Sequence, residues 1–259
     1  MTGKIDSHVH ICGEDLYPKW RKVIAEAKKK GIEKIMAVCP GPEEARQAVA
    51  IAGAEPMVDV AVGFHPNHVL RVSKEMWEEF EELVHLPQIK AVGEIGMDYY
   101  SYETVVPQVL QKELFVAQLE LAGRCKKPVL VHMRQAAEDT RRYLKGHLKT
   151  PGVMHNFHDS CRVMDDFLDM GMYISFSGQI LEGPESLREA VRKVPADRLL
   201  VETNSPARIL DSRCSGLGEG EYLSLIVDEI CVLRKMDREE LLGAVSDNYK
   251  RLFSVDSRN

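Results

Sequence analysis

Six segments of the chain carry imidazole, carboxylate or amide groups at or just after the end of a short apolar run. They hold His8 and His10 in "IDSHVH", His65 in "GFHP", Glu94 in "GEIGMDYY", His132 in "VHMR", His155 in "MHNF" and Asn204 in "ETNSP". Imidazole and carboxylate groups together suit divalent zinc, manganese or iron, and carboxylate with water also suits magnesium. Two such ions can activate a water and stabilise the attacking and leaving oxygens of a phosphoester. These residue types therefore indicate hydrolytic metal chemistry if the fold brings the segments together.

His8 and His10 are two residues apart, so on a strand both side chains would face the same side. With nine histidines in 259 residues, an incidental pair near the N-terminus is the alternative explanation. A single histidine at a strand end is also more often a hydrogen-bonded structural residue than a ligand. Six such segments at one rim would be difficult to explain by chance.

Eight short apolar runs alternate with longer segments of helical period. We expect strands at 4–6, 34–39, 58–64, 89–95, 128–132, 152–155, 172–177 and 198–202. Such apolar strands favour a parallel sheet covered by helices, and a (β/α)8 TIM barrel is the economical α/β arrangement. Its active site would lie at the carboxyl ends of the strands. The alternative is an open doubly wound sheet, but no GxGxxG motif follows the first run.

We expect a single domain over residues 1–259, because no linker or internal repeat interrupts the alternation. A helix is expected over 106–125, with Leu110, Leu114, Ala117 and Leu121 on one core-facing side. The glycine-rich stretch 214–221 is expected to be a loop before the last helices.

Composition is ordinary for a globular protein, with 44% hydrophobic residues, 29% charged residues and a net charge of -6. That charge offers no global attraction for nucleic acid, so any phosphate binding must be local. The six cysteines contain no CxxC pair, which argues against a zinc knuckle or a disulfide framework. No apolar run approaches the roughly 18 residues of a membrane span. We therefore expect no membrane association and a cytoplasmic location.

The motifs given above, together with "DNYKRLF" near the C-terminus, resemble the TatD family of metal-dependent deoxyribonucleases in the amidohydrolase superfamily. They occur in order across nearly the whole chain. The resemblance implies two divalent metal ions (Mg, Mn or Zn). By that resemblance His8 and His10 bind the first metal, Glu94 is shared by both, and His132 and His155 bind the second.

The resemblance also implies residues that contact the substrate or orient ligands. Arg134 would hold a phosphate oxygen bidentately, although a surface ion pair is the alternative. His65 would touch a phosphate, and Asp98 would orient a ligand. After His155 the chain departs from the family pattern with "NFHDS". His158 and Asp159 either add groups near the second metal or, as we favour, Asp159 or Ser160 caps the next helix.

Asn204 is the second departure, since the family pattern has aspartate there, as a ligand of the first metal and a catalytic group. Asparagine offers one neutral carbonyl oxygen instead of a carboxylate, so weaker binding of the first metal and slower hydrolysis are expected. The substitution is engineered, natural, or a sign of another substrate. Glu202 faces the same side but belongs to the family pattern, so we interpret it as structural.

The leading functional hypothesis is a metal-dependent phosphodiesterase that removes nucleotides from single-stranded or frayed DNA ends. No protein partner is expected. Two alternatives remain at the sequence level. One is a small-molecule amide or ester hydrolase of the same superfamily, since a fold does not fix its substrate. The other is a catalytically impaired binding subunit whose site has decayed at Asn204.

Overall fold

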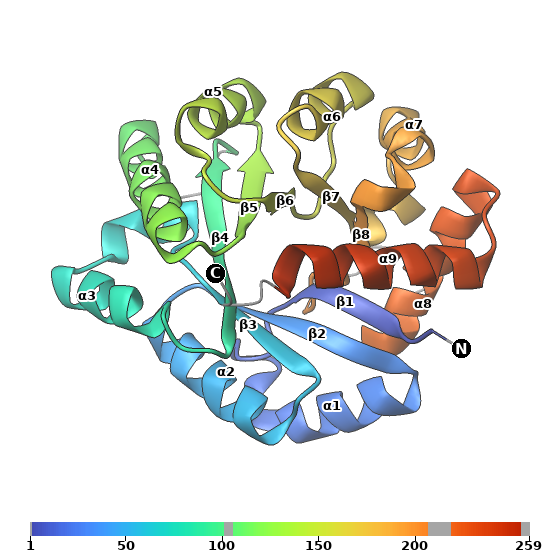
Figure 1. Ribbon diagram of the computed structural model, residues 1–259, viewed down its shortest axis with the longest axis horizontal. Coiled ribbons are helices and arrows are strands. Elements are labelled where there is room, and N and C mark those ends of the chain that lie inside the picture. The colour runs from blue at the N-terminus through green and yellow to red at the C-terminus, as the bar shows by residue number, and fades with distance from the viewer. Residues whose placement is uncertain (1, 101–105, 207–218, 255–259) are drawn as a thin grey trace.

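The computed structural model describes residues 2–100, 106–206 and 219–254. Eight parallel strands follow one another around the sheet in chain order, with helices on the outside (Figure 1). The strands are β1 (Lys4–Val9), β2 (Ile32–Cys39), β3 (Val58–Val62), β4 (Ile89–Asp98), β5 (Val129–Arg134), β6 (Gly152–Met154), β7 (Tyr173–Phe176) and β8 (Leu199–Val201). Each overlaps an expected strand, so the predicted (β/α)8 barrel is confirmed.

The helices are α1 (Trp20–Lys29), α2 (Pro42–Ala54), α3 (Lys74–Leu83), α4 (Gln108–Cys125), α5 (Ala137–His147), α6 (Cys161–Leu168), α7 (Glu185–Lys193), α8 (Glu219–Arg234) and α9 (Arg238–Phe253). Short 3-10 helices are η1 (Tyr17–Lys19), η2 (Pro66–Arg71), η3 (Gly178–Leu181) and η4 (Ala196–Arg198). Residues 214–218 of the expected loop lie outside the described residues, and 219–221 already belong to α8.

The predicted core face of α4 was wrong in part. Leu114 and Leu121 are buried as expected, but Leu110 and Ala117 are only half-buried. The buried face also includes two polar residues, Gln111 and Gln118. Apolar periodicity cannot predict that these two residues are buried, because their amides are buried to bind backbone groups.

The barrel closes between its first and last strands. Val9 pairs with Ser205 in a parallel bridge, and the Ser7 hydroxyl donates to the Val201 carbonyl at 3.0 Å. The strand residues are almost all buried, which explains why their sequences are continuously apolar and do not alternate.

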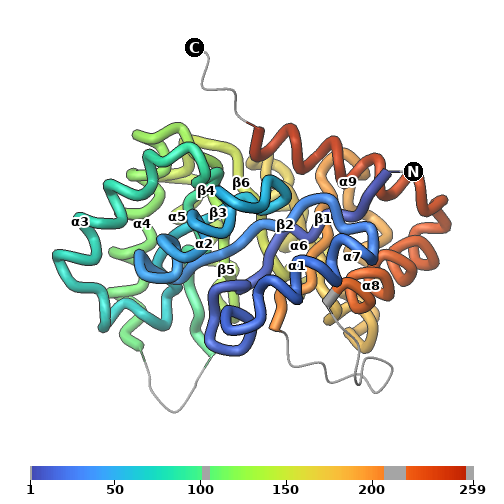
Figure 2. Tube along the Cα trace, turned by 90° about the horizontal axis from the view of Figure 1, so that it is seen from below, coloured from blue at the N-terminus to red at the C-terminus, as the bar shows by residue number. Residues whose placement is uncertain are grey.

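α9 covers the amino-terminal ends of the strands and contains the "DNYKRLF" motif. It runs across β1 (Figure 1), and the N-terminal segment lies beside it (Figure 2). The Asn248 side chain donates to the Leu199 carbonyl at 2.9 Å, and the Tyr249 hydroxyl donates to Asp59 at 2.9 Å. This motif therefore closes the end of the barrel opposite the histidine-bearing strand ends.

No helix in the described ranges combines the length and apolarity needed to cross a membrane. Five cysteines are free thiols: Cys12, Cys39, Cys125, Cys161 and Cys231. Cys214 lies outside the described residues.

Candidate metal centre

Glu94 lies at the centre of a cluster formed by the carboxyl ends of the strands. Its Oε1 lies 2.6 Å from His132 Nδ1 and 2.7 Å from His155 Nε2. Its Oε2 lies 3.5 Å from His8 Nε2 and 3.7 Å from His10 Nε2. Each carboxylate oxygen thus faces a different histidine pair, one carried by β1 and its end and the other by β5 and the end of β6. Four of the six sequence segments meet here.

The two histidines within each pair are also close to each other. His8 Nε2 and His10 Nε2 are 3.2 Å apart, and His132 Nδ1 and His155 Nε2 are 3.3 Å apart. The rings of His8 and His155 stack at 4.1 Å between centroids. Nitrogen atoms that converge in this way satisfy one another poorly unless a proton or a cation lies between them. This donor set therefore fits bound cations.

Further carboxylates fix the orientation of the second histidine pair. Asp98 Oδ2 lies 3.1 Å from His132 Nε2, and Glu202 Oε1 lies 3.1 Å from His155 Nδ1. A carboxylate behind an imidazole sets the tautomer and orients the ring. Asp98 is placed as the sequence interpretation expects. Glu202 touches a histidine of the cluster directly.

His65 lies beside the same half of the cluster. Its Nε2 is 3.5 Å from Glu94 Oε1, and its Nδ1 accepts the Asn67 N–H at 3.1 Å, so its ring is fixed at the start of η2. Together His65, Asp98 and His132 offer a further group of donor atoms close enough to hold a cation. His65 is therefore placed to contact either a metal or a substrate phosphate.

Two buried glutamines of α4 hold the backbone next to this site. Gln118 accepts the Phe64 N–H at 2.6 Å and donates to the Phe64 carbonyl at 3.1 Å. Gln111 accepts the Asp98 N–H at 2.8 Å and donates to the Asp98 carbonyl at 2.9 Å. One helix therefore fixes His65, the neighbour of Phe64, and Asp98. The sequence interpretation missed this role, for which two glutamines two helical turns apart were the available signal.

Asp6 was also missed, although a carboxylate inside the apolar first strand is a visible signal. It is fully buried, and its oxygens accept the Thr203 N–H at 2.9 Å and the Thr203 hydroxyl at 2.6 Å. Asp6 therefore joins β1 to the segment that follows β8, next to His8. Burial raises the pKa of Asp6 to about 7 against the lowering effect of these hydrogen bonds.

Charge in the cluster is distributed unevenly. Burial lowers the pKa of His10 to about 4 and that of His65 to about 3, so both are neutral imidazoles at pH 7. Burial also lowers the pKa of His155, but the nearby Glu94 and Glu202 carboxylates outweigh it and raise that pKa to about 10. Burial raises the pKa of Glu94, but the nearby histidines hold it well below its ordinary value. Glu94 and Glu202 thus attract positive charge, which a metal ion would supply in place of protons.

Asn204 is half-buried at the same rim, with its backbone N–H donating to the His8 carbonyl at 3.0 Å. Its φ of 54° is left-handed, a region that asparagine and aspartate adopt more readily than most residues. Its side-chain amide makes no hydrogen bond with any residue in the described part of the chain. Asn204 therefore belongs to the rim, next to the first histidine pair.

Arg134 ends β5, two residues after His132. Its guanidinium carbon lies 3.9 Å from the centre of the Tyr100 ring. Stacking of this kind orients the planar group for bidentate contacts.

In the "NFHDS" segment, Asp159 accepts the Ser160 N–H at 2.6 Å just before α6, while the His158 ring lies 3.0 Å from the Asn156 carbonyl. Ser160 is the N-cap residue of α6, and within the described residues no side chain caps this helix, so the helix cap that we favoured was wrong. Asp159 instead contacts the N–H of the residue that follows it.

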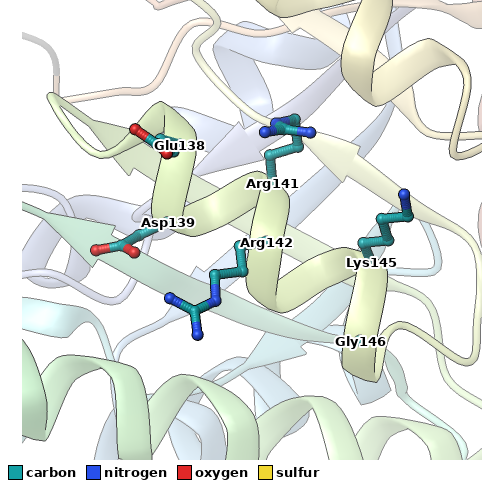
Figure 3. A pocket seen from close by; sticks show the side chains of 6 residues that line it. All are labelled: Glu138, Asp139, Arg141, Arg142, Lys145 and Gly146. Carbon is teal, nitrogen blue, oxygen red and sulfur yellow. The ribbon is translucent and has the colours of Figure 1, made fainter.

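A cavity of about 370 Å³ lies away from this rim on α5. Figure 3 shows its lining side chains, with Arg141 and Lys145 on one side of the helix and Asp139 and Arg142 on the other. Arg141 is paired with Asp166 at 3.7 Å. None of the residues lining this cavity belongs to the histidine cluster, so we do not assign the chemistry to it.

Comparison with known proteins identifies the family. Residues 5–254 match the family described as "TatD related DNase". The chain belongs to the TatD family. It is 30% identical over 254 residues to the uncharacterized metal-dependent hydrolase YabD of Bacillus subtilis, covering 97% of this chain and 99% of that protein. It is 31% identical over 241 residues to the 3'-5' ssDNA/RNA exonuclease TatD of Enterobacter lignolyticus, covering 90% and 92%.

The crystal structure of YJJV, a TatD homologue from Escherichia coli K12, matches this chain with a TM-score of 0.90 and 26% identity, covering 98% of each chain. The present TatD-family chain is therefore a metal-dependent hydrolase on a TIM barrel. The expected hydrolytic metal chemistry is confirmed at this level. Candidate metal-binding groups of histidines and carboxylates lie around Glu94.

Proposed function

We propose that the chain hydrolyses phosphodiester bonds at single-stranded or frayed DNA ends, with two divalent ions held around Glu94. The observation that carries the proposal is the position of the Glu94 carboxylate. Each of its two oxygens faces a separate pair of imidazole nitrogens. A carboxylate can bridge two cations, whereas an imidazole cannot. Magnesium, manganese and zinc are the ions we expect.

Each residue has a distinct task in this proposal. His8 and His10 hold one ion, while His132 and His155 hold the other. The bound ions supply an activated water and stabilise the charge on the phosphate oxygens. Glu94 keeps the two halves at a fixed separation.

The remaining side chains orient groups and bind the substrate. Asp98 and Glu202 prevent the second histidine pair from rotating, because each contacts the ring nitrogen on the far side. Arg134 and His65 receive phosphate oxygens, with Arg134 providing two parallel N–H donors. Recognition is therefore concentrated on a phosphate next to the cluster.

The substrate assignment is supported by relatives named 3'-5' ssDNA/RNA exonuclease, of Enterobacter lignolyticus and Erwinia tasmaniensis, at 31% and 32% identity. A net charge of -6 disfavours tight non-specific binding to a long duplex. A short single-stranded end held mainly by metals and Arg134 is compatible with a negative net charge, because it needs little attraction from the rest of the protein surface. Asn204 attenuates the reaction in this proposal, because it places a neutral amide where a carboxylate would attract a cation and accept a proton from water.

The test uses labelled single-stranded DNA with magnesium or manganese and follows its shortening. His132→Ala should lower the rate at least about 100-fold, since it removes a nitrogen at 2.6 Å from Glu94. His147→Ala, at the half-buried end of α5 and outside the histidine cluster, is the matched control and should retain activity. A His132→Ala protein as active as the original would identify a contaminating nuclease.

Metal content tests the two-ion part separately. Elemental analysis of metal-loaded protein should give two ions per chain, and Glu94→Gln should lower that number. One ion per chain in the unaltered protein would contradict the proposed pair of sites, even if DNA is hydrolysed.

A further inference from the structure

A cavity of about 250 Å³ lies at the barrel rim beside the metal centre. It lies between the residues that join β2 to α2, the 3-10 helix η2 and the start of α3; we call it the rim cavity, lined by 40–44, Phe64, His68, Arg71, Val72 and Met76. The His68 ring lies 5.8 Å from the His65 ring, and His65 is 3.5 Å from Glu94. One histidine thus separates the rim cavity from the metal centre.

Glu44 gives the rim cavity a hydrogen-bond acceptor that lacks a partner. Its Oε2 is buried and makes no hydrogen bond with any residue in the described ranges. A carboxylate without a hydrogen-bond partner is costly to hold partly out of water, and a ligand in the cavity with N–H donors would satisfy its other oxygen, Oε1, which is not buried. Glu44 belongs to the first turn of α2, so its position is fixed by a helix.

Arg71 lies at another edge of the same cavity, at the end of η2. It forms no ion pair with a residue in the described part of the chain. The His68 ring lies near the Pro40 carbonyl, so η2 meets the residue that follows β2 at the cavity. The cavity therefore offers the carboxylates of Glu43 and Glu44 as acceptors and the Arg71 guanidinium as a cationic donor.

The floor of the rim cavity is apolar. Phe64 is 1% exposed, and its ring contacts Trp77 and Phe80. Gly41 leaves room above it, because a Cβ atom at Gly41 would lie 3.9 Å from both Met76 Cε and Phe64 Cε1. Gly41 has a φ of 173°, an extended conformation that any residue adopts, so its small size here leaves space and is not required by the backbone.

We propose that the rim cavity binds the base of the terminal nucleotide whose phosphodiester lies at the metal centre, favouring bases with an exocyclic amino group. This inference rests on the proposed phosphodiesterase function. Glu44 would accept from the amino group of the base, as glutamate does from N4 of cytosine. Thymine has no amino group, and its one N–H lies between two carbonyl oxygens. These oxygens would be repelled by the Glu44 carboxylate. Arg71 would contact the acceptors of the base, while the apolar floor contacts its face.

The test compares oligonucleotides that differ only in the terminal nucleotide that the protein removes first: deoxycytidine, thymidine or an abasic sugar. For the unaltered protein with manganese, kcat/KM should be about tenfold higher for the cytosine end than for the thymine or abasic end, the size expected for a buried polar group that gains a partner. Glu44→Gln should bring the cytosine-to-thymine ratio close to one. Gly41→Leu, which fills the cavity, should bring the cytosine-to-abasic ratio close to one.

Glu82→Gln provides the matched control, because it removes the same charge from an exposed position on α3 and should keep both ratios. Thermal melting of each variant verifies folding, and the near-isosteric Glu44→Gln carries the test if Gly41→Leu is unstable. Equal kcat/KM for all three ends in the unaltered protein, or ratios that survive Glu44→Gln in folded protein, would overturn the inference while leaving the nuclease proposal intact. Failure to cleave any of the three would overturn both.

Discussion

The backbone N–H of Asn204 donates to the carbonyl oxygen of His8 at 3.0 Å. One residue further along each segment, Val9 bridges to Ser205, and the His10 N–H donates to the Ser205 carbonyl at 2.8 Å. The last strand segment therefore joins the first at the point where both deliver groups to the metal centre. The backbone holds Asn204 in place, so its side chain can be exchanged without loss of this contact.

Asn204→Asp should increase DNA hydrolysis about 100-fold or more, and tighten binding of the first metal. The added carboxylate lies beside His8 and His10, where it attracts a cation and accepts a proton from water. The left-handed backbone tolerates aspartate as well as asparagine. Steady-state rates across a manganese titration measure both effects.

Asn156→Asp provides the matched control for this substitution. Asn156 also has a left-handed backbone, with a φ of 46°, and also follows a strand at the rim. Its side-chain oxygen accepts from Gln179 at 3.1 Å. An aspartate at 204 that leaves turnover and metal affinity unchanged, or a gain of equal size at 156, would show that Asn204 does not attenuate the site.

Arg134→Lys should lower kcat/KM for DNA about tenfold, mostly through KM. Lysine keeps the charge but loses the planar pair of donors and the stacking on Tyr100. Arg142→Lys on α5 makes the same exchange away from the rim and should leave kcat/KM unchanged. If both exchanges have the same small effect, Arg134 does not bind a phosphate.

The sequence was sufficient for the barrel and for the cluster because both depend on local signals. Continuous apolar runs with helical segments between them predict parallel strands, and parallel strands bring their carboxyl ends to one rim. His8, His132, His155 and Glu94 could therefore be grouped before any distance was known. What could not be predicted was which oxygen of Glu94 faces which histidine pair.

The supporting residues escaped prediction because their partners are backbone groups or side chains distant in sequence. Gln111 and Gln118 interrupt the apolar face of α4, and only the fold reveals that each meets the N–H and C=O of a residue on another element. Asp6 meets Thr203 only after the barrel has closed. A periodicity argument treats all three as flaws in a core-facing pattern.

Gln118→Leu should destabilise the protein by about 2 to 4 kcal/mol, since leucine of similar size leaves the Phe64 N–H and C=O buried without partners. Urea unfolding measures the change. Gln108→Leu at the exposed start of the same helix should change stability by less than about 0.5 kcal/mol. If Gln118→Leu also changed the free energy of unfolding by less than about 0.5 kcal/mol, water would be replacing the Gln118 amide as the partner of the Phe64 backbone.

Asp6 should make the metal-free protein less stable as pH rises from about 4 to 7. Its pKa is 3.8 in an unfolded chain and about 7 in the folded protein, so the folded state binds more protons between these values. Stability then falls with rising pH over that window. Asparagine does not titrate, so the melting temperature of Asp6→Asn minus that of the unaltered protein should increase from pH 4 to pH 7. Thermal melts with a chelator measure this difference. A difference that is constant with pH, or decreases, would show that the folded Asp6 carboxyl titrates near its ordinary value.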